Sequence, residues 1–378
     1  EERHKMLVHQ KELEAAQALA KQVSHDIRSP LTALNMVVSL LKNTPEEMRL
    51  LMKNATQRIN DIANTLLEKS QATAAPTVAN GPDPVPVHSK LKSTLIAPLI
   101  DSLVSEKRME YRTSSMVDIE ADSNKSYGGF AKIDPVEFKR VLSNLINNSV
   151  EAFDASEGKI IVALRKYAQN IEVIVSDNGK GIPAHILQKI GEKGFSFGKE
   201  NSSSGSGLGV HHAKHTIESF GGTFSILSQQ NQGTQIRMSL PLVEPPDWFA
   251  ESIAIPKGTS VVCIDDDLSI HNLWNNRLQK YLDEKDVKSL HQWTSVEDFK
   301  KSFQPHTSTL YLVDYDFLNQ SQNGLQLISK LGIAKNSILV TNQYYESQIQ
   351  NEALKLGLKI LPKSMAVSIG IDIVDSLK

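Results

Sequence analysis

Apolar positions in the first 70 residues recur at alternating spacings of three and four, which predicts two amphipathic helices over residues 13–41 and 48–66. Between them, Thr44, Pro45 and Glu47 supply an N-cap, a first-turn proline and the carboxylate of a capping box. A stripe this narrow cannot make a core alone. We therefore expect an antiparallel helical hairpin that dimerises into a four-helix bundle.

The remaining pattern predicts a multidomain α plus α/β protein. Between residues 89 and 244, helices and strands alternate without the order of a parallel doubly wound sheet, so an α/β sandwich is expected. After residue 258, buried strands recur and end in polar residues, which favours an open, doubly wound α/β domain. Proline and glycine mark linkers between these parts. The expected divisions are a hairpin at 1–70, a linker at 71–88, the sandwich at 89–244, a linker at 245–257 and the doubly wound domain at 258–378.

Composition narrows the function classes. The formal net charge is -2 and no block of Lys and Arg is present, which argues against nucleic acid as the main partner. The single cysteine, Cys263, excludes an internal disulfide framework and suits a reducing cytosol. No apolar run is long enough to span a bilayer, and the chain opens in the middle of a helical pattern. We expect the cytoplasmic portion of a longer protein, with a sensor or inner-membrane anchor upstream.

A histidine in the first helix has neighbours that suit nucleophilic chemistry. His25 lies two residues from both Val23 and Ile27, so it points away from the apolar stripe. Alone, it would be a surface histidine with no task. Asp26 can accept the ring Nδ1–H and leave Nε2 as a nucleophile, and Pro30 should bend the helix here.

The run S-H-D-I-R-S-P-L around His25 resembles the H-box of histidine kinases, in which the histidine is autophosphorylated. Its form is close to H-[ED]-x-x-[TN]-P. Ser29 stands where that form has Thr or Asn, a position linked in the family to phosphatase activity. The resemblance implies that His25 takes the phosphoryl group while Asp26 orients the ring.

Polar residues of the middle part suit a nucleotide and its metal. Asn144 and Asn148 lie one turn apart on a predicted helix, and their amide oxygens suit Mg²⁺, although a solvated polar face explains them equally well. Asp177 ends a predicted strand and can accept from an amino group, while Gly179 and Gly181 let backbone approach a ligand.

A second glycine-rich run precedes a predicted helix. Gly205, Gly207 and Gly209 alternate with Ser206 and Leu208, so the N–H groups of this run can cradle phosphate. By itself the run could equally be a flexible turn.

The order of these groups is more specific than any one of them. Five groups occur in the order of the N, G1, F, G2 and G3 boxes of the GHKL ATPases and kinases, and they resemble these boxes. They are the asparagines, D-N-G-K-G-I, the pair Phe195 and Phe197, G-S-G-L-G, and Gly233-Thr234. The resemblance implies ATP and Mg²⁺, with Asp177 on the adenine amino group and Asn148 on the metal. The implied nucleotide-binding residues are Asn144, Asn148, Asp177, Gly179, Gly181, Gly205, Gly207, Leu208, Gly209 and Thr234.

One position departs from this pattern. Glu151 stands where many kinases of the family have a lysine near the phosphates. The basic group that steadies the γ-phosphate stays open among Lys199, Lys214, His211 and His212.

Acids and a lysine follow the predicted strands of the last part. Asp265 and Asp266 follow one strand, Asp314 ends another, and two more end at Thr341 and near Lys363. Because carboxyl ends of parallel strands share one edge, these groups should converge, and crowded acids favour Mg²⁺. The alternative is an acidic strand end with a surface lysine.

This set resembles the receiver domain of response regulators, and the resemblance implies a doubly wound, flavodoxin-like fold. The resemblance implies that Asp314 is the phosphoacceptor, that Asp265 and Asp266 bind Mg²⁺ with Asp314 and the backbone of Asp316, and that Thr341 and Lys363 bind phosphoryl oxygens. The loop after Asp314 is long, which makes Asp316 a rival acceptor. Ile360 replaces the usual aromatic switch residue.

Together these features predict a hybrid sensor histidine kinase of a two-component phosphorelay, in which ATP phosphorylates His25 and the group passes to Asp314. We expect a homodimer, with a separate histidine phosphotransfer protein or response regulator as a downstream partner. Two alternatives stay open: a GHKL ATPase that drives conformational change without phosphotransfer, and a signalling scaffold that only binds nucleotide.

Overall fold

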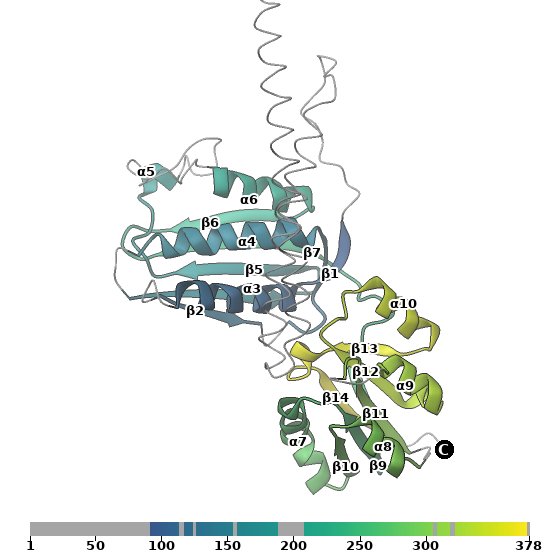
Figure 1. Cartoon of the computed structure of the whole chain (residues 1–378). Helices are drawn as coiled ribbons and strands as arrows, with labels where there is room; N and C mark the ends of the chain where they lie inside the picture. Colours follow the sequence, from purple (N-terminus) through teal and green to yellow (C-terminus); the bar gives the residue numbers. More distant parts are fainter. Residues whose placement is uncertain are drawn as a thin grey trace, which may run out of the picture.

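The computed structural model describes residues 91–112, 117–123, 126–153, 157–187, 208–304, 308–317 and 322–375. The expected hairpin and first linker lie outside these residues. So do several expected site residues, namely His25, Asp26, Phe195, Phe197, Lys199, Gly205 and Gly207. The described chain forms two α/β units, one from β1 to β7 and one from β8 to β14 (Figure 1).

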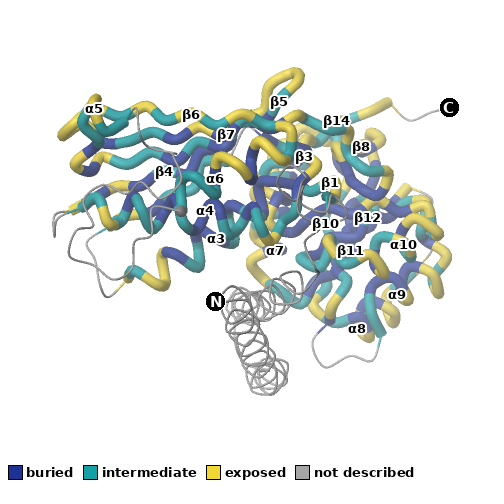
Figure 2. Tube along the Cα trace, turned by 90° about the horizontal axis from the view of Figure 1, so that it is seen from above, coloured by how far each residue is buried: buried dark blue, intermediate teal, exposed yellow. Residues whose placement is uncertain are grey.

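The first unit is a two-layer α/β sandwich. Its described sheet has seven strands in the order β1-β3-β7-β5-β4-β2, with β6 also paired to β7; only β2 and β4 are parallel. The long helices cover one face of this sheet (Figures 1 and 2). The elements are β1 (Lys92–Leu95), α3 (Ile96–Tyr111), β2 (Val117–Asp122), β3 (Phe130–Ile133), α4 (Pro135–Val150), β4 (Gly158–Lys166), β5 (Asn170–Asp177), α5 (Ala184–Leu187), α6 (Leu208–Ser219), β6 (Thr223–Ser228) and β7 (Thr234–Val243).

Helix α4 is the central helix of this layer, and its sequence fixes its start and its orientation. The Asp134 side chain accepts from the N–H groups of Val136 and Glu137 at 2.9 and 3.3 Å, and Pro135 occupies the first turn. The apolar face is buried against the sheet through Phe138, Val141, Leu142, Leu145 and Ile146. Its polar stripe is thereby turned away from the core.

The second unit contains a five-stranded parallel sheet in the order β10-β9-β11-β12-β13. In this order β10, which follows β9 in the chain, lies at the edge of the sheet beside β9. This is a doubly wound order, and the carboxyl ends of all five parallel strands lie at one edge of the sheet. The elements are β9 (Thr259–Ile264), α7 (Leu268–Asp283), β10 (Val287–Trp293), α8 (Val296–Ser302), β11 (Thr309–Asp314), α9 (Gly324–Leu331), η2 (Ala334–Asn336), β12 (Ser337–Thr341), α10 (Ser347–Lys355), β13 (Lys359–Pro362) and η3 (Lys363–Met365).

The segment expected as the second linker is packed between the units. The side chains of Trp248 and Phe249 are buried, with 7% and 1% of their surface exposed. The N–H of Ile360 donates to the Trp248 carbonyl at 2.6 Å, and the N–H of Ala250 donates to the Ile360 carbonyl at 3.0 Å. This segment therefore extends the parallel sheet beside β13. It continues into β8 (Ser252–Pro256), which pairs in parallel with β14 (Gly370–Val374).

Aromatic contacts explain why this segment is ordered. The Phe249 ring lies 5.0 Å from Phe130 and 5.2 Å from Tyr127 between centroids, and the Tyr127 hydroxyl donates to the Ala250 carbonyl. Trp248 lies 6.2 Å from Tyr344 of the second unit. The prolines that indicated a linker end the preceding strand, while the two aromatic side chains join the two cores.

Candidate functional site

Asp177 at the end of β5 has a carboxylate that is held by three hydrogen bonds. Its Oδ1 accepts from the N–H groups of Gly179 at 3.0 Å and Thr234 at 3.2 Å, and the Ser149 hydroxyl donates to Oδ2 at 3.0 Å. Burial raises the pKa of Asp177, while these hydrogen bonds act in the opposite direction. The carboxylate is therefore fixed where β5, β7 and α4 meet.

Glycines close the backbone around this carboxylate. Gly233 has a φ of 85°, and a Cβ there would lie 1.9 Å from the Asp177 carbonyl oxygen. Gly181 has a φ of 59°, and its Cβ would lie 2.0 Å from the Gln229 carbonyl oxygen. Only glycine fits either position without movement of the backbone.

The asparagine face of α4 meets the start of α6. A Cβ on Gly209 would lie 3.8 Å from the Asn148 amide nitrogen, so the first turn of α6 lies beside this asparagine. Leu208 begins α6, and Asn144 lies one turn before Asn148. A helix N-terminus next to amide groups is an arrangement that suits a phosphate and its metal.

The structure shows the surroundings of the candidates for the basic group near the γ-phosphate. Glu151 is exposed at the C-terminal end of α4, and Lys214 pairs with Glu218 at 4.0 Å. The His211 ring packs on His215 at 4.4 Å between centroids. Lys214 and His211 therefore already have partners within α6, and Glu151 lies at the C-terminal end of α4.

His212 has partners on α4. Its Nε2 lies 3.4 Å from the Glu137 carboxylate and also contacts the guanidinium of Arg140. The hydrogen bond with His212 is the largest cause that lowers the pKa of Glu137, with Arg140 adding to it. No sequence motif singles out Arg140, although it precedes Asn144 by four residues.

The second unit brings its predicted site residues together at the carboxyl edge of the sheet. Ligand oxygens of Asp265, Asp266 and Asp314 all lie within 4.8 Å of one another. The Lys363 Nζ lies 2.8 Å from Asp314 Oδ2 and 3.0 Å from Asp265 Oδ2. Asp265, Asp314 and Lys363 are almost completely buried, and Thr341 is buried at the end of the neighbouring β12. The carboxylates are the hard oxygen donors that suit Mg²⁺.

Asp316 is placed differently. Its carboxylate is exposed and accepts a hydrogen bond from the Gln343 side-chain amide. Asp314, not Asp316, therefore shares the buried cluster with Lys363. Ile360 is buried on β13 beside Phe249, where it has backbone partners in the connecting segment.

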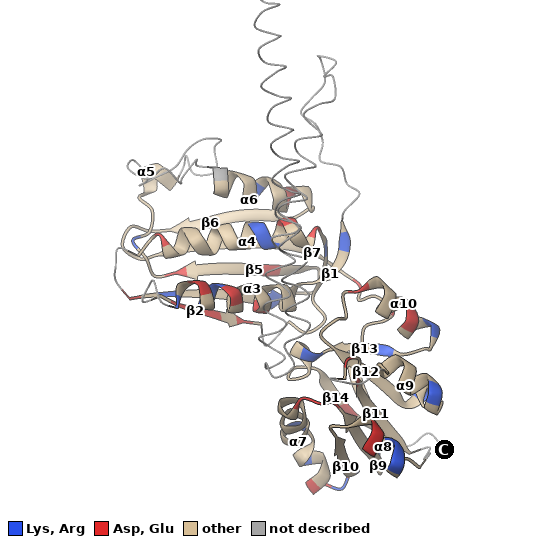
Figure 3. Cartoon of the chain, in the orientation of Figure 1, with Lys and Arg blue, Asp and Glu red and all other residues tan. Residues whose placement is uncertain are grey.

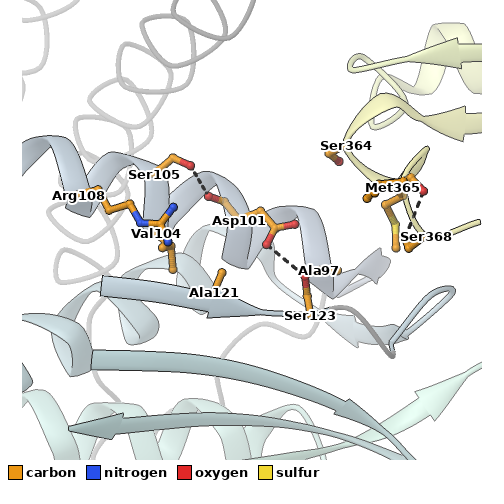
Figure 4. A pocket seen from close by; sticks show the side chains of 11 residues that line it. Ala97, Asp101, Val104, Ser105, Arg108, Ala121, Ser123, Ser364, Met365 and Ser368 are labelled. Carbon is orange, nitrogen blue, oxygen red and sulfur yellow. Dashed lines mark hydrogen bonds between the residues drawn. The ribbon is translucent and has the colours of Figure 1, made fainter. Parts of the chain in front are cut away.

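A cavity of about 300 Å³ lies between α3 and the segment that follows Lys363 (Figure 4). It is lined by Asp101, Arg108 and Ser123 on one side and Ser364 and Ser368 on the other. Burial raises the pKa of Asp101, which accepts from the Ser123 hydroxyl at 3.3 Å. The cavity includes none of the predicted nucleotide or acidic-cluster residues.

Comparison with known families agrees with this geometry. Residues 133–244 match the model for histidine kinase-, DNA gyrase B- and HSP90-like ATPases, and residues 15–75 match the His Kinase A phospho-acceptor domain. Two parts of the chain therefore match domains that occur in histidine kinases. The matched part of the first unit, from residue 133, is accordingly a GHKL-type ATPase domain, which implies ATP binding. The match to the phospho-acceptor domain falls outside the described residues.

Curated relatives are sensor or sporulation kinases. Sporulation kinase B of Bacillus subtilis is 26% identical over 62% of this chain and 52% of its own length. The autoinducer 1 sensor kinase/phosphatase LuxN of Vibrio campbellii is 26% identical over 79% of this chain and 36% of its own length. The chain thus spans about half or less of these two relatives.

Among solved structures, full-length ShkA in complex with AMPPNP is similar over 93% of this chain and 71% of its own chain, with 15% identity and a TM-score of 0.38.

None of the helices in the described part of the chain has the length and apolar character that a membrane span requires.

Proposed function

We propose that this chain is the catalytic portion of a hybrid sensor histidine kinase, which phosphorylates His25 from ATP and passes the phosphoryl group to Asp314. The observation that carries the proposal is the buried cluster of Asp265, Asp314 and Lys363 in the same chain as an ATPase domain and a phospho-acceptor match. A phosphoryl donor needs an acceptor, and a carboxylate beside a lysine in the same chain is a suitable one.

In the ATPase domain, Asp177 would accept the adenine amino group, because its carboxylate is fixed at the end of β5. The N–H groups at the start of α6 would bind phosphate oxygens. Asn148 would hold Mg²⁺, which neutralises charge on the phosphates. Gly209, close to Asn148, belongs to the segment that would close over the phosphates.

The first chemical step is an in-line displacement. His25 Nε2 attacks the γ-phosphorus, the bond to the β,γ-bridging oxygen breaks, and ADP leaves. Asp26 accepts the Nδ1–H and stabilises the charge that develops on the ring. Positioning and charge neutralisation supply most of the catalysis in such transfers.

In the second step, a carboxylate oxygen of Asp314 attacks the phosphorus and His25 is the leaving group. Lys363 and Thr341 bind the phosphoryl oxygens. Mg²⁺ would be held by Asp265, Asp266 and Asp314 with the Asp316 backbone. The doubly wound strand order and the cluster at its carboxyl edge support assignment of the second unit as a receiver domain.

We further propose a homodimer through the hairpin, with a sensor region upstream and a histidine phosphotransfer protein or response regulator downstream. The phospho-acceptor match at residues 15–75 supports the dimer, because this is the region of the predicted hairpin.

Labelling with γ-labelled ATP tests the pathway. The wild-type chain should show label on both residues, His25→Ala should abolish labelling, and Asp314→Ala should trap it on an acid-labile phosphohistidine. Label that persists in His25→Ala would refute the proposal. Steady phosphate release without protein label would favour the ATPase alternative, and nucleotide binding with neither would favour the scaffold.

A further inference from the structure

Arg140 lies on the face of α4 that carries the nucleotide-binding asparagines. Arg140, Asn144 and Asn148 follow at intervals of four residues, so they form one stripe along the helix. This stripe faces α6, because Arg140 contacts His212 and Asn148 lies beside Gly209.

The position of Arg140 along α4 matches the length of the nucleotide. Ser149 binds Asp177 and so marks the adenine end of the helix. Arg140 is nine residues earlier, which at about 1.5 Å per residue is roughly 13 to 14 Å along the axis. This is comparable to the distance between the adenine amino group and the γ-phosphate of an extended ATP. In Figure 3 the blue band of α4 lies away from the red tip of β5, toward the other end of the helix.

The guanidinium is oriented, yet part of it has no acceptor. One terminal nitrogen binds the Glu137 carboxylate at 2.5 Å and also contacts His212 Nε2. The Arg140 Nε and the His212 Nδ1 are buried from solvent and have no hydrogen-bond partner among the described residues. A buried N–H without an acceptor is unfavourable, and the guanidinium fork suits phosphate oxygens.

We propose that Arg140 binds the γ-phosphate of ATP, with Glu137 and His212 acting as positioning residues that hold its guanidinium over the Asn144–Asn148 stripe. Arg140 thus supplies the positive charge that Glu151 does not. Glu151 lies at the C-terminal end of α4, whereas Arg140 lies near its N-terminal end, where the transferred phosphate would be. The inference rests on the proposed function, since it requires ATP bound beside α4.

The test is a comparison of two nucleotides on the full chain. Affinities for Mg²⁺ with a non-hydrolysable ATP analogue, and for Mg²⁺ with ADP, are measured by titration calorimetry for the wild type, Arg140→Gln and Arg140→Lys. We expect Arg140→Gln to weaken the analogue by about 10- to 100-fold, because charge-assisted hydrogen bonds are lost. ADP affinity should change less than about twofold, since ADP has no γ-phosphate. Arg140→Lys, which keeps the charge without the fork, should fall between.

Lys139→Gln is the matched control. It also removes a positive charge from α4, but Lys139 lies on a different face of the helix from Arg140. It should leave both affinities near the wild-type values. Equal loss of the analogue and ADP in Arg140→Gln, with an unchanged circular dichroism spectrum, would show that Arg140 only joins α4 to α6 and would overturn the inference. Unchanged analogue affinity would also overturn it. A wild-type chain that binds neither nucleotide would overturn the proposed function together with this inference.

Discussion

At the scale of single residues, the half-buried and buried charges of both sites are held by specific partners. Asp177 has three donors around its carboxylate, and Lys363 lies between two buried acids. Removing one member of such a group leaves the others without compensation. Single substitutions in these groups therefore test both sites directly.

Asp177→Asn should weaken ATP binding by about 10- to 100-fold, because the charged acceptor for the adenine amino group is lost. The wild-type affinity should depend on pH in a defined direction. Burial raises the pKa of Asp177, so the binding form, the carboxylate, is lost as the pH falls through this raised value. Titration calorimetry across a pH series measures both effects, and Asp177→Asn should lack this part of the dependence. The same pH profile in both proteins would contradict the assignment.

Lys363→Ala should destabilise the second unit by about 3–5 kcal/mol without divalent cations, because Asp265 and Asp314 then face each other without a counter-charge. Added Mg²⁺ should raise the melting temperature of this variant more than that of the wild type. Lys335→Ala, at an exposed position, is the control and should melt like the wild type in both conditions. Equal Mg²⁺ responses in all three would argue against a cation at these acids.

At the scale of elements, the helix caps and the tight turns determine where the site residues lie. The Asp134 cap starts α4 at Pro135, and the apolar face then sets the direction of the Arg140–Asn148 stripe. At the end of β5, the turn before β7 packs its backbone on β5 at Gly233. A change in either element would move several site groups together.

Gly233→Ala should both destabilise the ATPase domain and weaken nucleotide binding, because its Cβ would lie 1.9 Å from the Asp177 carbonyl oxygen. Gly258→Ala is a matched control. Gly258 has a similar positive φ of 76°, but nothing lies within 4 Å of its Cβ position. The control should lose only about 1–2 kcal/mol of stability, which is the cost of left-handed backbone for alanine. Chemical denaturation and nucleotide titration measure the pair, and equal losses in stability would show that the close contact is unimportant.

At the scale of the whole molecule, the two units share a continuous apolar contact. Phe249 packs on Phe130 and Tyr127 of the ATPase domain, while its neighbours pair with β13 of the second unit. Trp248 reaches Tyr344, three residues after Thr341 in the loop that leaves the acidic cluster. The described units are thus joined by a core and not by a free tether.

Phe249→Ala should cost about 3–5 kcal/mol, since a nearly fully buried aromatic ring is removed. We expect the variant to unfold in two calorimetric transitions, one for each unit, where the wild type unfolds in one. Leu227→Ala, at a side chain 56% exposed on β6, is the control and should keep the wild-type profile. A single transition of unchanged temperature in Phe249→Ala would show that the contact does not couple the units.

Much of the site was predictable because its signals are local. Asp265, Asp314 and Thr341 end buried strands, and Asp177 ends a strand before a glycine turn, so strand patterning alone places them at sheet edges. The cap at Asp134 likewise fixes the register of α4. The order of the boxes supported an ATPase domain, which the family match bears out.

Other features depend on segments far apart in the sequence. A pattern of prolines indicated a linker at 245–257, but Trp248 and Phe249 found partners in Phe130 and Ile360, more than 100 residues away in each direction. The pairing of Arg140 with His212 depends on how α4 packs against α6, which no local pattern specifies.

The sequence by itself determined the chemistry of this protein: which side chains are present, on which element each lies, and at which end of a strand or turn. The tertiary structure decided which of them meet. Lys363 is inserted between Asp265 and Asp314, and the connecting segment is buried between two units. The physical reason is that strand ends and caps are set by short-range backbone preferences. Contacts between distant segments arise only when apolar faces are buried against one another.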